Sequence, residues 1–256
     1  MSYFERLGPD RFRATPNVGG AWSTDEQHIA PALGLLAHVV ELDRDRRREG
    51  DLVVARLSYD ILGTVPVDVV DTAVTLLRPG RTIELVEASL AYNGRDVVRM
   101  RAWLIATRDT SAVAGGHLPS IPGPQDMPAW DPKQVWPGGF VENVEVRRIE
   151  KEPGRAAFWV HTPLPLVGGE DVSPLAATVG LLDIANGMTV RADPRSVAFL
   201  NVDLTAHIFR LPRGGWVGFD TTVEFGPAGL GVTHSVIHDV DGPIGISSQI
   251  LTVRPG

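Results

Sequence analysis

Cysteine is absent from this sequence of 256 residues. Its absence excludes disulfide bonds, zinc or iron–sulfur sites held by thiolates, and a cysteine nucleophile. A surplus of basic residues is lacking too, because 24 Lys and Arg stand against 31 Asp and Glu, a net charge of −7. Since phosphate binding needs a basic surface, the composition argues against a nucleic-acid partner.

Long apolar runs are also missing. A bilayer span takes about 20 apolar residues, and the most apolar stretch, 172–190, is broken by Pro, Gly, Asp and Asn. The first residues, MSYFERLGPDRFRAT, lack the apolar segment of a secretory signal. We therefore expect a cytoplasmic protein without membrane contact.

Three common catalytic motifs are lacking: the Gly-x-Ser-x-Gly elbow, the Walker-type phosphate loop and the His-Glu-x-x-His pair. The sequence predicts no metal site and no cofactor. With 43% apolar and 21% charged residues, the composition is that of a globular chain with a sizeable core.

The chain divides at residues 108–138, which hold six prolines and little apolar periodicity, and which we interpret as a linker. The halves on either side, 1–107 and 139–256, follow one plan. Each has an apolar helix candidate, at 31–41 and at 173–188. Four strand-like runs follow each helix, near 52–62, 67–77, 82–92 and 96–107 in the first half and near 198–211, 216–225, 229–239 and 243–253 in the second.

The residues of the two halves also align. PALGLLAHVV (31–40) matches PLAATVGLLD (174–183), and RLSYDI (56–61) matches FLNVDL (199–204). Both helix candidates are apolar almost all round, as expected for a helix wrapped by a curved sheet.

Each half closes with a hairpin signal, Asn93-Gly94 or Asp241-Gly242, because Gly tolerates the positive φ that tight turns need. Each half is therefore one helix plus an antiparallel sheet. A single half would leave a sheet face and an edge uncovered, and pairing the halves covers both. We predict an α+β double hotdog fold, with the two halves packed into one continuous sheet.

The aligned halves differ at three polar positions. Asp183 lies on an apolar helix where the first half has Val40, or Val39 if the register slips by one. A buried carboxylate is costly unless hydrogen-bonded and often has a perturbed pKa. The alternative is a solvent-facing residue or an ion pair, although no basic residue lies within two helical turns.

Gln249 replaces Ala102 in the last strand. Because Gln249 is two residues from Leu251, both side chains lie on the same face of the strand, toward the helix. A buried amide needs a hydrogen-bond partner, and Asp183 is one possible partner. A bond to irregular backbone is the alternative. Asn201 replaces Ser58, but alternation places it on the face away from the core. It reaches Asp183 only at a strand end or a bulge.

The strings FLNVDLTAHIFRLPRGGWVGFDT and GPAGLGVTHSVIHDVDGPIGISSQILTV resemble the C-terminal half of the acyl-CoA thioesterase II family, in its actinobacterial double-hotdog branch. The resemblance covers most of 12–107 and 139–254 and is more specific in the second half. It implies a hydrolase that converts fatty acyl-CoA to free acid and CoA. In that family an Asp, a Thr or similar residue, and a Gln together activate water; they fall on Asp183, Asn201 and Gln249.

Two departures from the family stand out. Asn201 lacks the hydroxyl of the usual Thr, and the His-Gly-Gly-Pro-like turn before the first helix here reads Gln27-His28-Ile29-Ala30-Pro31. The lost glycines restrict how closely a thioester approaches the backbone.

The resemblance implies a mechanism without a covalent intermediate. Asp183 acts as general base, and the two amides fix the water. Free N–H groups at the first helix N-terminus polarise the carbonyl, with His28, Ile29 and Ala30 as the candidates. The acyl chain enters the apolar cleft between the halves. Candidates for the CoA phosphates are Arg210, Arg213 and Arg254.

Two alternatives stay open. A non-catalytic acyl-CoA or lipid binder would keep the cleft, and the missing glycines favour it. A hotdog hydratase would use Asp203 and His207, although their spacing is one residue short and the surrounding motif is absent. We also expect a homo-oligomer. Acyl chain length cannot be deduced, because pocket depth depends on packing.

Overall fold

The computed structural model describes residues 1–48, 50 and 52–256 of the chain. The strands of the first half are β1 (Phe4–Gly8), β2 (Arg11–Ala14), β3 (Leu52–Ile61), β4 (Val69–Arg78), β5 (Ile83–Tyr92) and β6 (Arg95–Ala106). Those of the second half are β7 (Ala129–Trp130), β8 (Glu145–Glu152), β9 (Arg155–His161), β10 (Val197–Asn201), β11 (Asp203–Ile208), β12 (Val217–Phe225), β13 (Leu230–Asp239) and β14 (Gly242–Pro255).

The helices are α1 (Ile29–Arg47), α2 (Gly139–Glu142), α3 (Pro174–Val179) and α4 (Ala185–Met188). Single 3-10 turns are η1 (Pro16–Val18), η2 (Ser111–Val113), η3 (Pro124–Asp126), η4 (Pro132–Gln134) and η5 (Leu182–Ile184). No helix among the described residues has both the length and the apolar content needed to span a membrane.

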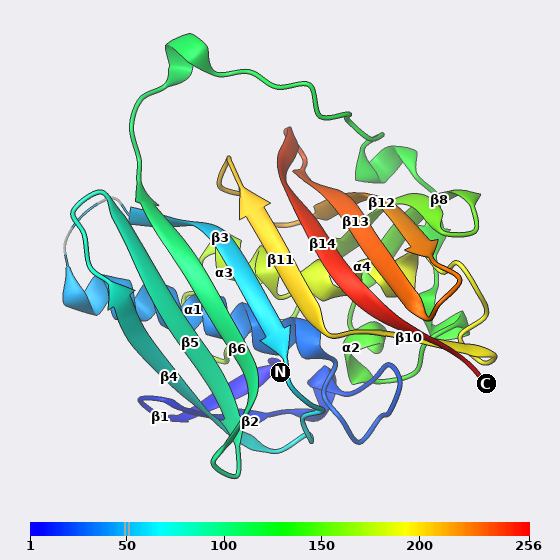
Figure 1. Ribbon diagram of the computed structural model, residues 1–256, viewed down its shortest axis with the longest axis horizontal. Coiled ribbons are helices and arrows are strands. Elements are labelled where there is room, and N and C mark those ends of the chain that lie inside the picture. The colour runs from blue at the N-terminus through cyan, green and yellow to red at the C-terminus, as the bar shows by residue number, and fades with distance from the viewer. Residues whose placement is uncertain (49, 51) are drawn as a thin grey trace.

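One sheet runs through the whole molecule (Figure 1). Its strand order in the described chain is β1-β2-β4-β5-β6-β3-β11-β14-β13-β12-β9-β8-β7, and β10 also pairs with β14. The halves meet where β3 pairs antiparallel with β11, and there Ser58 and Thr205 lie opposite each other with their hydroxyls 2.9 Å apart. The predicted α+β double hotdog is confirmed.

Each half also contains a hairpin that the sequence analysis did not predict. β1 and β2 extend the sheet beyond β4, and β8 and β9 extend it beyond β12. Both hairpins precede the helix of their half, so the strand order of one half repeats that of the other.

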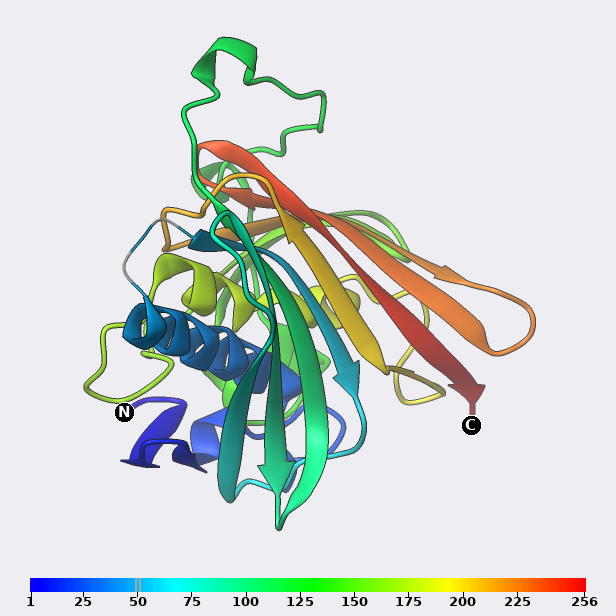
Figure 2. The ribbon, with the colours of Figure 1, turned by 60° about the vertical axis from the view of Figure 1, so that its left-hand side comes forward.

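Helix α1 lies in the concave face of the sheet, with β4, β5, β6 and β3 curving around it (Figure 2). It extends beyond the predicted 31–41 at both ends, and from Ala30 to Glu41 each of its residues is buried. Burial on every side explains why the sequence has no polar face there. Arg44, Arg46 and Arg47 in its last turn suit the negative end of the helix dipole.

The second helix, predicted as continuous over 173–188, is instead broken. Ser173 caps α3, whose helical turns stop at Val179, and the chain continues through η5 into α4. Gly180 stands at the break, where it packs against Gly34 of α1 so closely that a Cβ built on Gly34 would lie 2.7 Å from the Gly180 Cα. Close crossing of the two helices therefore requires glycine at position 34, whereas a Cβ on Gly180 would have its nearest contact at 3.4 Å.

The Pro-rich segment 108–138 leaves β6 as an exposed arch and returns to the second half (Figure 1). Trp159 Nε1 donates to the Pro122 carbonyl at 2.7 Å, and β7 adds to β8 at the sheet edge. Trp136 is buried and its Nε1 donates to the Gly187 carbonyl at 2.8 Å. Trp136 thus fixes the end of the segment to the body, and this end belongs to the second half.

The inner faces of the two half-sheets differ in polarity. Gln249 lies opposite Thr233, and Ser247 opposite Ser235. At the matching ladder positions of the first half, Ala102 lies opposite Val86, and Met100 opposite Ala88. At equivalent positions, the inner face of the first half-sheet is thus apolar and that of the second is polar. The polar face lies on the side of Asp183.

Candidate functional site

Three predicted residues meet at one carboxylate. Asp183 lies in η5 and is 5% exposed. Its Oδ1 accepts hydrogen bonds from Asn201 Nδ2 at 2.6 Å and from Gln249 Nε2 at 2.8 Å. The contact predicted between Asp183 and the last strand is confirmed, and both amides are directed at the carboxylate itself.

A strand break brings Asn201 to the site. β10 ends at Asn201 and β11 begins at Asp203, so Val202 interrupts the alternation that would have turned Asn201 away. Asn201 Nδ2 also donates to the Asp203 carbonyl at 3.1 Å, which fixes the amide. The alignment of Asn201 with Ser58 was wrong. When Gln249 is matched to Ala102, Leu251, which lies opposite Asn201, matches Leu104, which lies opposite Val54.

The surroundings of Asp183 change its acidity. Burial raises the pKa of the Asp183 carboxyl to about 7, and the nearby charge of Asp203 acts in the same direction. The hydrogen bonds from Asn201 and Gln249 oppose this rise because they stabilise the charged form. A carboxyl that titrates near neutrality can both accept and return a proton at physiological pH.

His28 stands at the N-terminus of α1, on the other side of the carboxylate. Its Nδ1 accepts a hydrogen bond from the Ala30 N–H at 3.2 Å and thereby caps the helix, which places the ring proton on Nε2. Burial lowers the pKa of the His28 imidazole to about 3, so the ring is neutral. Nδ1 lies 4.0 Å from Asp183 Oδ2, and this contact is therefore no ion pair.

The helix start offers fewer free amides than predicted. The His28 N–H donates to the Val18 carbonyl at 2.7 Å, and the Ala30 N–H is taken by the His28 ring. Ile29, the first residue of α1, is the one of the three whose N–H has no partner in the described structure. The expectation of several free donors over His28–Ala30 was wrong for two of them, because the Val18 carbonyl and the His28 ring occupy them.

The structure does not bring Arg210 to this site. Its guanidinium forms two hydrogen bonds of 2.7 Å with Asp239 and also donates to the carbonyl of Gly242. Arg213 likewise pairs with Asp241, at 3.0 Å. The phosphate contact of Arg210 stays a prediction, and in the structure Asp239 and Asp241, beside the β13–β14 turn, pair with these two arginines.

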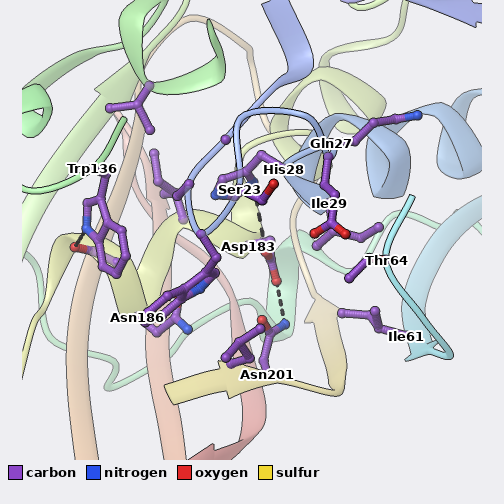
Figure 3. Close-up of a pocket in the computed structure, with 18 of the residues that line it drawn as sticks. Ser23, Gln27, His28, Ile29, Ile61, Thr64, Trp136, Asp183, Asn186 and Asn201 are labelled. Atoms are coloured by element: carbon purple, nitrogen blue, oxygen red, sulfur yellow. Dashed lines mark hydrogen bonds and ion pairs between the residues drawn. The ribbon is translucent and has the colours of Figure 1, made fainter. Parts of the chain in front are cut away.

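Asp183 and Asn201 line a cavity of about 120 Å³ between the two halves (Figure 3). The first half contributes residues before and at the start of α1 and the end of β3; the second contributes η5, α4 and β10. Much of the lining is apolar. The sequence analysis missed several lining residues, among them Trp22, Gln27, Trp136, Asn186 and Phe199.

Outside the cavity, the hydratase pair finds no support. His207 is exposed, and Asp203 Oδ1 accepts from the Ile250 N–H at 2.6 Å. In the described residues, no three His, Asp or Glu side chains are grouped so that they could hold a metal.

Both halves of the chain match domains of a known family. Residues 117–253 match the acyl-CoA thioesterase C-terminal domain, and residues 18–105 match the acyl-CoA thioesterase N-terminal domain. The chain belongs to the acyl-CoA thioesterase family. This thioesterase is therefore a thioester hydrolase, and no curated protein matches it in sequence.

Solved structures support the fold over the full length. A hot dog fold protein of unknown function from Alicyclobacillus acidocaldarius has a TM-score of 0.77 at 15% identity, covering 99% of this chain and 96% of that one. An acyl-CoA thioesterase II from Mycobacterium marinum has a TM-score of 0.69 at 17% identity, covering 99% and 95%. A tesB protein from Mycobacterium avium subs paratuberculosis has a TM-score of 0.67 at 16% identity, covering 98% and 96%.

Proposed function

We propose that this thioesterase hydrolyses acyl-CoA with a water molecule activated by Asp183, without a covalent intermediate and without a metal or cofactor. One observation carries the proposal. Both amide donors use Asp183 Oδ1, while Oδ2 has no hydrogen bond within the described residues and the carboxyl lines the cavity. Asn201 and Gln249 thus hold the base in place and leave its second oxygen for water.

The steps balance around that oxygen. Water attacks the thioester carbonyl carbon while Asp183 Oδ2 takes one of its protons. The resulting tetrahedral intermediate collapses, the carbon–sulfur bond breaks, and the proton on Asp183 passes to the departing thiolate. A pKa near 7 for Asp183 suits both proton transfers.

The start of α1 supplies the electrophilic assistance. The free N–H of Ile29 is a donor for the carbonyl oxygen, where negative charge develops, and the positive end of a 19-residue helix adds to it. Gln27 also lines the cavity, and its Oε1 is buried with no partner in the described structure. That oxygen is an acceptor for an amide N–H of the pantetheine arm.

The test is thiol release from acyl-CoAs by the wild type and by Asp183→Asn, which keeps the shape of the side chain. We expect kcat to fall by about 10²–10⁴-fold, since general base catalysis is worth that much. Asp126→Asn, an exposed change in the Pro-rich segment, is the control. Unchanged turnover in Asp183→Asn would remove Asp183 as the base. Tight acyl-CoA binding without thiol release by the wild type would favour the non-catalytic binder.

A further inference from the structure

Three aromatic rings from distant parts of the chain gather at one end of the cavity. Trp22 comes from the loop before α1, Trp136 from the Pro-rich segment and Phe199 from β10. The Trp22 ring centroid lies 4.9 Å from that of Trp136 and 5.3 Å from that of Phe199, both edge to face. We call Trp22, Trp136 and Phe199 the aromatic cage.

The two ends of the cavity differ in character. Trp136 and Asn186 lie on one side of Asp183, and Ile61 and Thr64 on the other (Figure 3). Thr64 and its neighbour Gly63 are exposed, so that end opens to water and suits the polar CoA arm. The caged end suits an apolar acyl group, because burial of apolar surface is favourable there.

The cage is held rigidly. Trp136 is 4% exposed, and its Nε1 is tied to the Gly187 carbonyl at 2.8 Å. Phe199 is 1% exposed and is backed by Phe225, with ring centroids 5.6 Å apart. Moving either ring breaks a buried hydrogen bond or opens a void in the core, and both are costly. Trp22, 41% exposed, closes the cage from the solvent side.

We infer that the aromatic cage fixes the acyl specificity of the proposed reaction, and that the preferred substrates carry short acyl groups. The cavity of about 120 Å³ is closed on this side by the buried rings of Trp136 and Phe199, so a short acyl group fits in front of them. Longer chains meet the rings of Trp136 and Phe199. The inference rests on the proposed function and names the substrate class of the same site.

The experiment measures kcat/KM for acetyl-, butyryl-, octanoyl- and palmitoyl-CoA. For the wild type we expect butyryl-CoA to be preferred over palmitoyl-CoA by about 100-fold, within the range that one to two poorly accommodated methylenes produce. Trp136→Ala should reduce that preference by about 10-fold or more. Trp130→Ala is the matched control, because Trp130 belongs to the same segment but lies outside the cavity lining.

If Trp136→Ala fails to fold, Trp136→Leu and the partly exposed Trp22→Ala provide the same comparison. Equal wild-type rates on butyryl- and palmitoyl-CoA would overturn the inference, as would the same chain-length profile in the cage variants and in Trp130→Ala.

A second readout separates the inference from the proposed function. Binding of the same four acyl-CoAs to Asp183→Asn, followed by tryptophan fluorescence, needs no turnover. Tighter binding of short chains, relaxed by the Trp136 substitution, supports the cage even if the wild type hydrolyses nothing. Tighter binding of palmitoyl-CoA refutes it, whether or not hydrolysis occurs.

Discussion

At the residue scale, the acidity of Asp183 sets the pH dependence of the proposed reaction. Its pKa is about 7, and the base must be ionised to take a proton from water. We expect kcat to rise with pH through about 7 and then level off. A pH–rate profile from 5.5 to 9 with a short-chain acyl-CoA checks this. A rate that is flat over that range would show that another group limits proton transfer.

The same pKa affects stability. The pKa of Asp183 in the folded state lies above the ordinary value of 3.8, so ionisation of Asp183 disfavours the folded state. The unfolded chain ionises first as pH rises, and stability falls between about pH 4 and pH 7. The Asp183→Asn variant does not lose this stability, because its amide does not ionise.

We therefore expect the stability of Asp183→Asn relative to the wild type to be higher at pH 8 than at pH 5, by on the order of 2 kcal/mol. Urea unfolding at both pH values measures the difference. The prediction is wrong if the free energies of unfolding of the variant and the wild type differ by the same amount at pH 5 and at pH 8.

The sequence alone predicts some contacts of the site and not others, and individual residues show why. The contact between Asp183 and Gln249 follows from strand parity and from an apolar helix, both local patterns. Asn201 was left in doubt because the break at Val202 does not alter the polar–apolar alternation. The pairing of Arg210 with Asp239 could not be predicted, because the two residues face each other only after the β13–β14 hairpin forms.

At the element scale, the crossing of α1 with the second helix depends on Gly34. Gly→Ala inside a helix normally stabilises by about 0.5–1 kcal/mol. At Gly34, however, a Cβ would lie 2.7 Å from the Gly180 Cα and 2.9 Å from the Ala176 carbonyl oxygen. We expect Gly34→Ala to destabilise the fold by about 1–3 kcal/mol.

Denaturant midpoints measure that change. Gly115→Ala is the control, since a Cβ there meets nothing within 4 Å. A stabilised Gly34→Ala chain would mean that the helices separate at little cost.

Which elements could be predicted depends on the range of the interactions that form them. The central strands and α1 follow from periodicity, and the hairpin turns from Asn93-Gly94 and Asp241-Gly242. The break in the second helix depends on α1 packing against Gly180, and the inward position of Trp136 depends on the Gly187 carbonyl. Interactions between residues so far apart in the sequence leave no periodic signal.

At the scale of the whole molecule, the halves form one folding unit. β3 and β11 join them into one sheet, and a single core of buried residues includes Leu33 and Leu36 of α1 together with Leu182 and Phe199 of the second half. We expect one unfolding transition, since residues of both halves complete the same core.

Far-UV circular dichroism and tryptophan fluorescence during urea unfolding should therefore give coincident curves. Trp103 reports on the first half, and Trp159 and Trp216 on the second. Two separated transitions would show that each half folds independently. The expected homo-oligomer stays a prediction, which light scattering can test.

The unequal inner faces of the two half-sheets have a consequence for stoichiometry. Where the second half has Gln249, the first has Ala102, which has no amide. The carboxylate of Glu41, near the end of the buried part of α1, is already hydrogen-bonded to Ser173 at the start of α3, at 2.5 Å between oxygens. Duplication has thus left two copies of the scaffold but one complete set of the proposed catalytic groups. A non-hydrolysable acyl-CoA analogue, titrated calorimetrically, should saturate at one equivalent per 27.6 kDa chain. Two equivalents would mean that the copy without Gln249 still binds substrate.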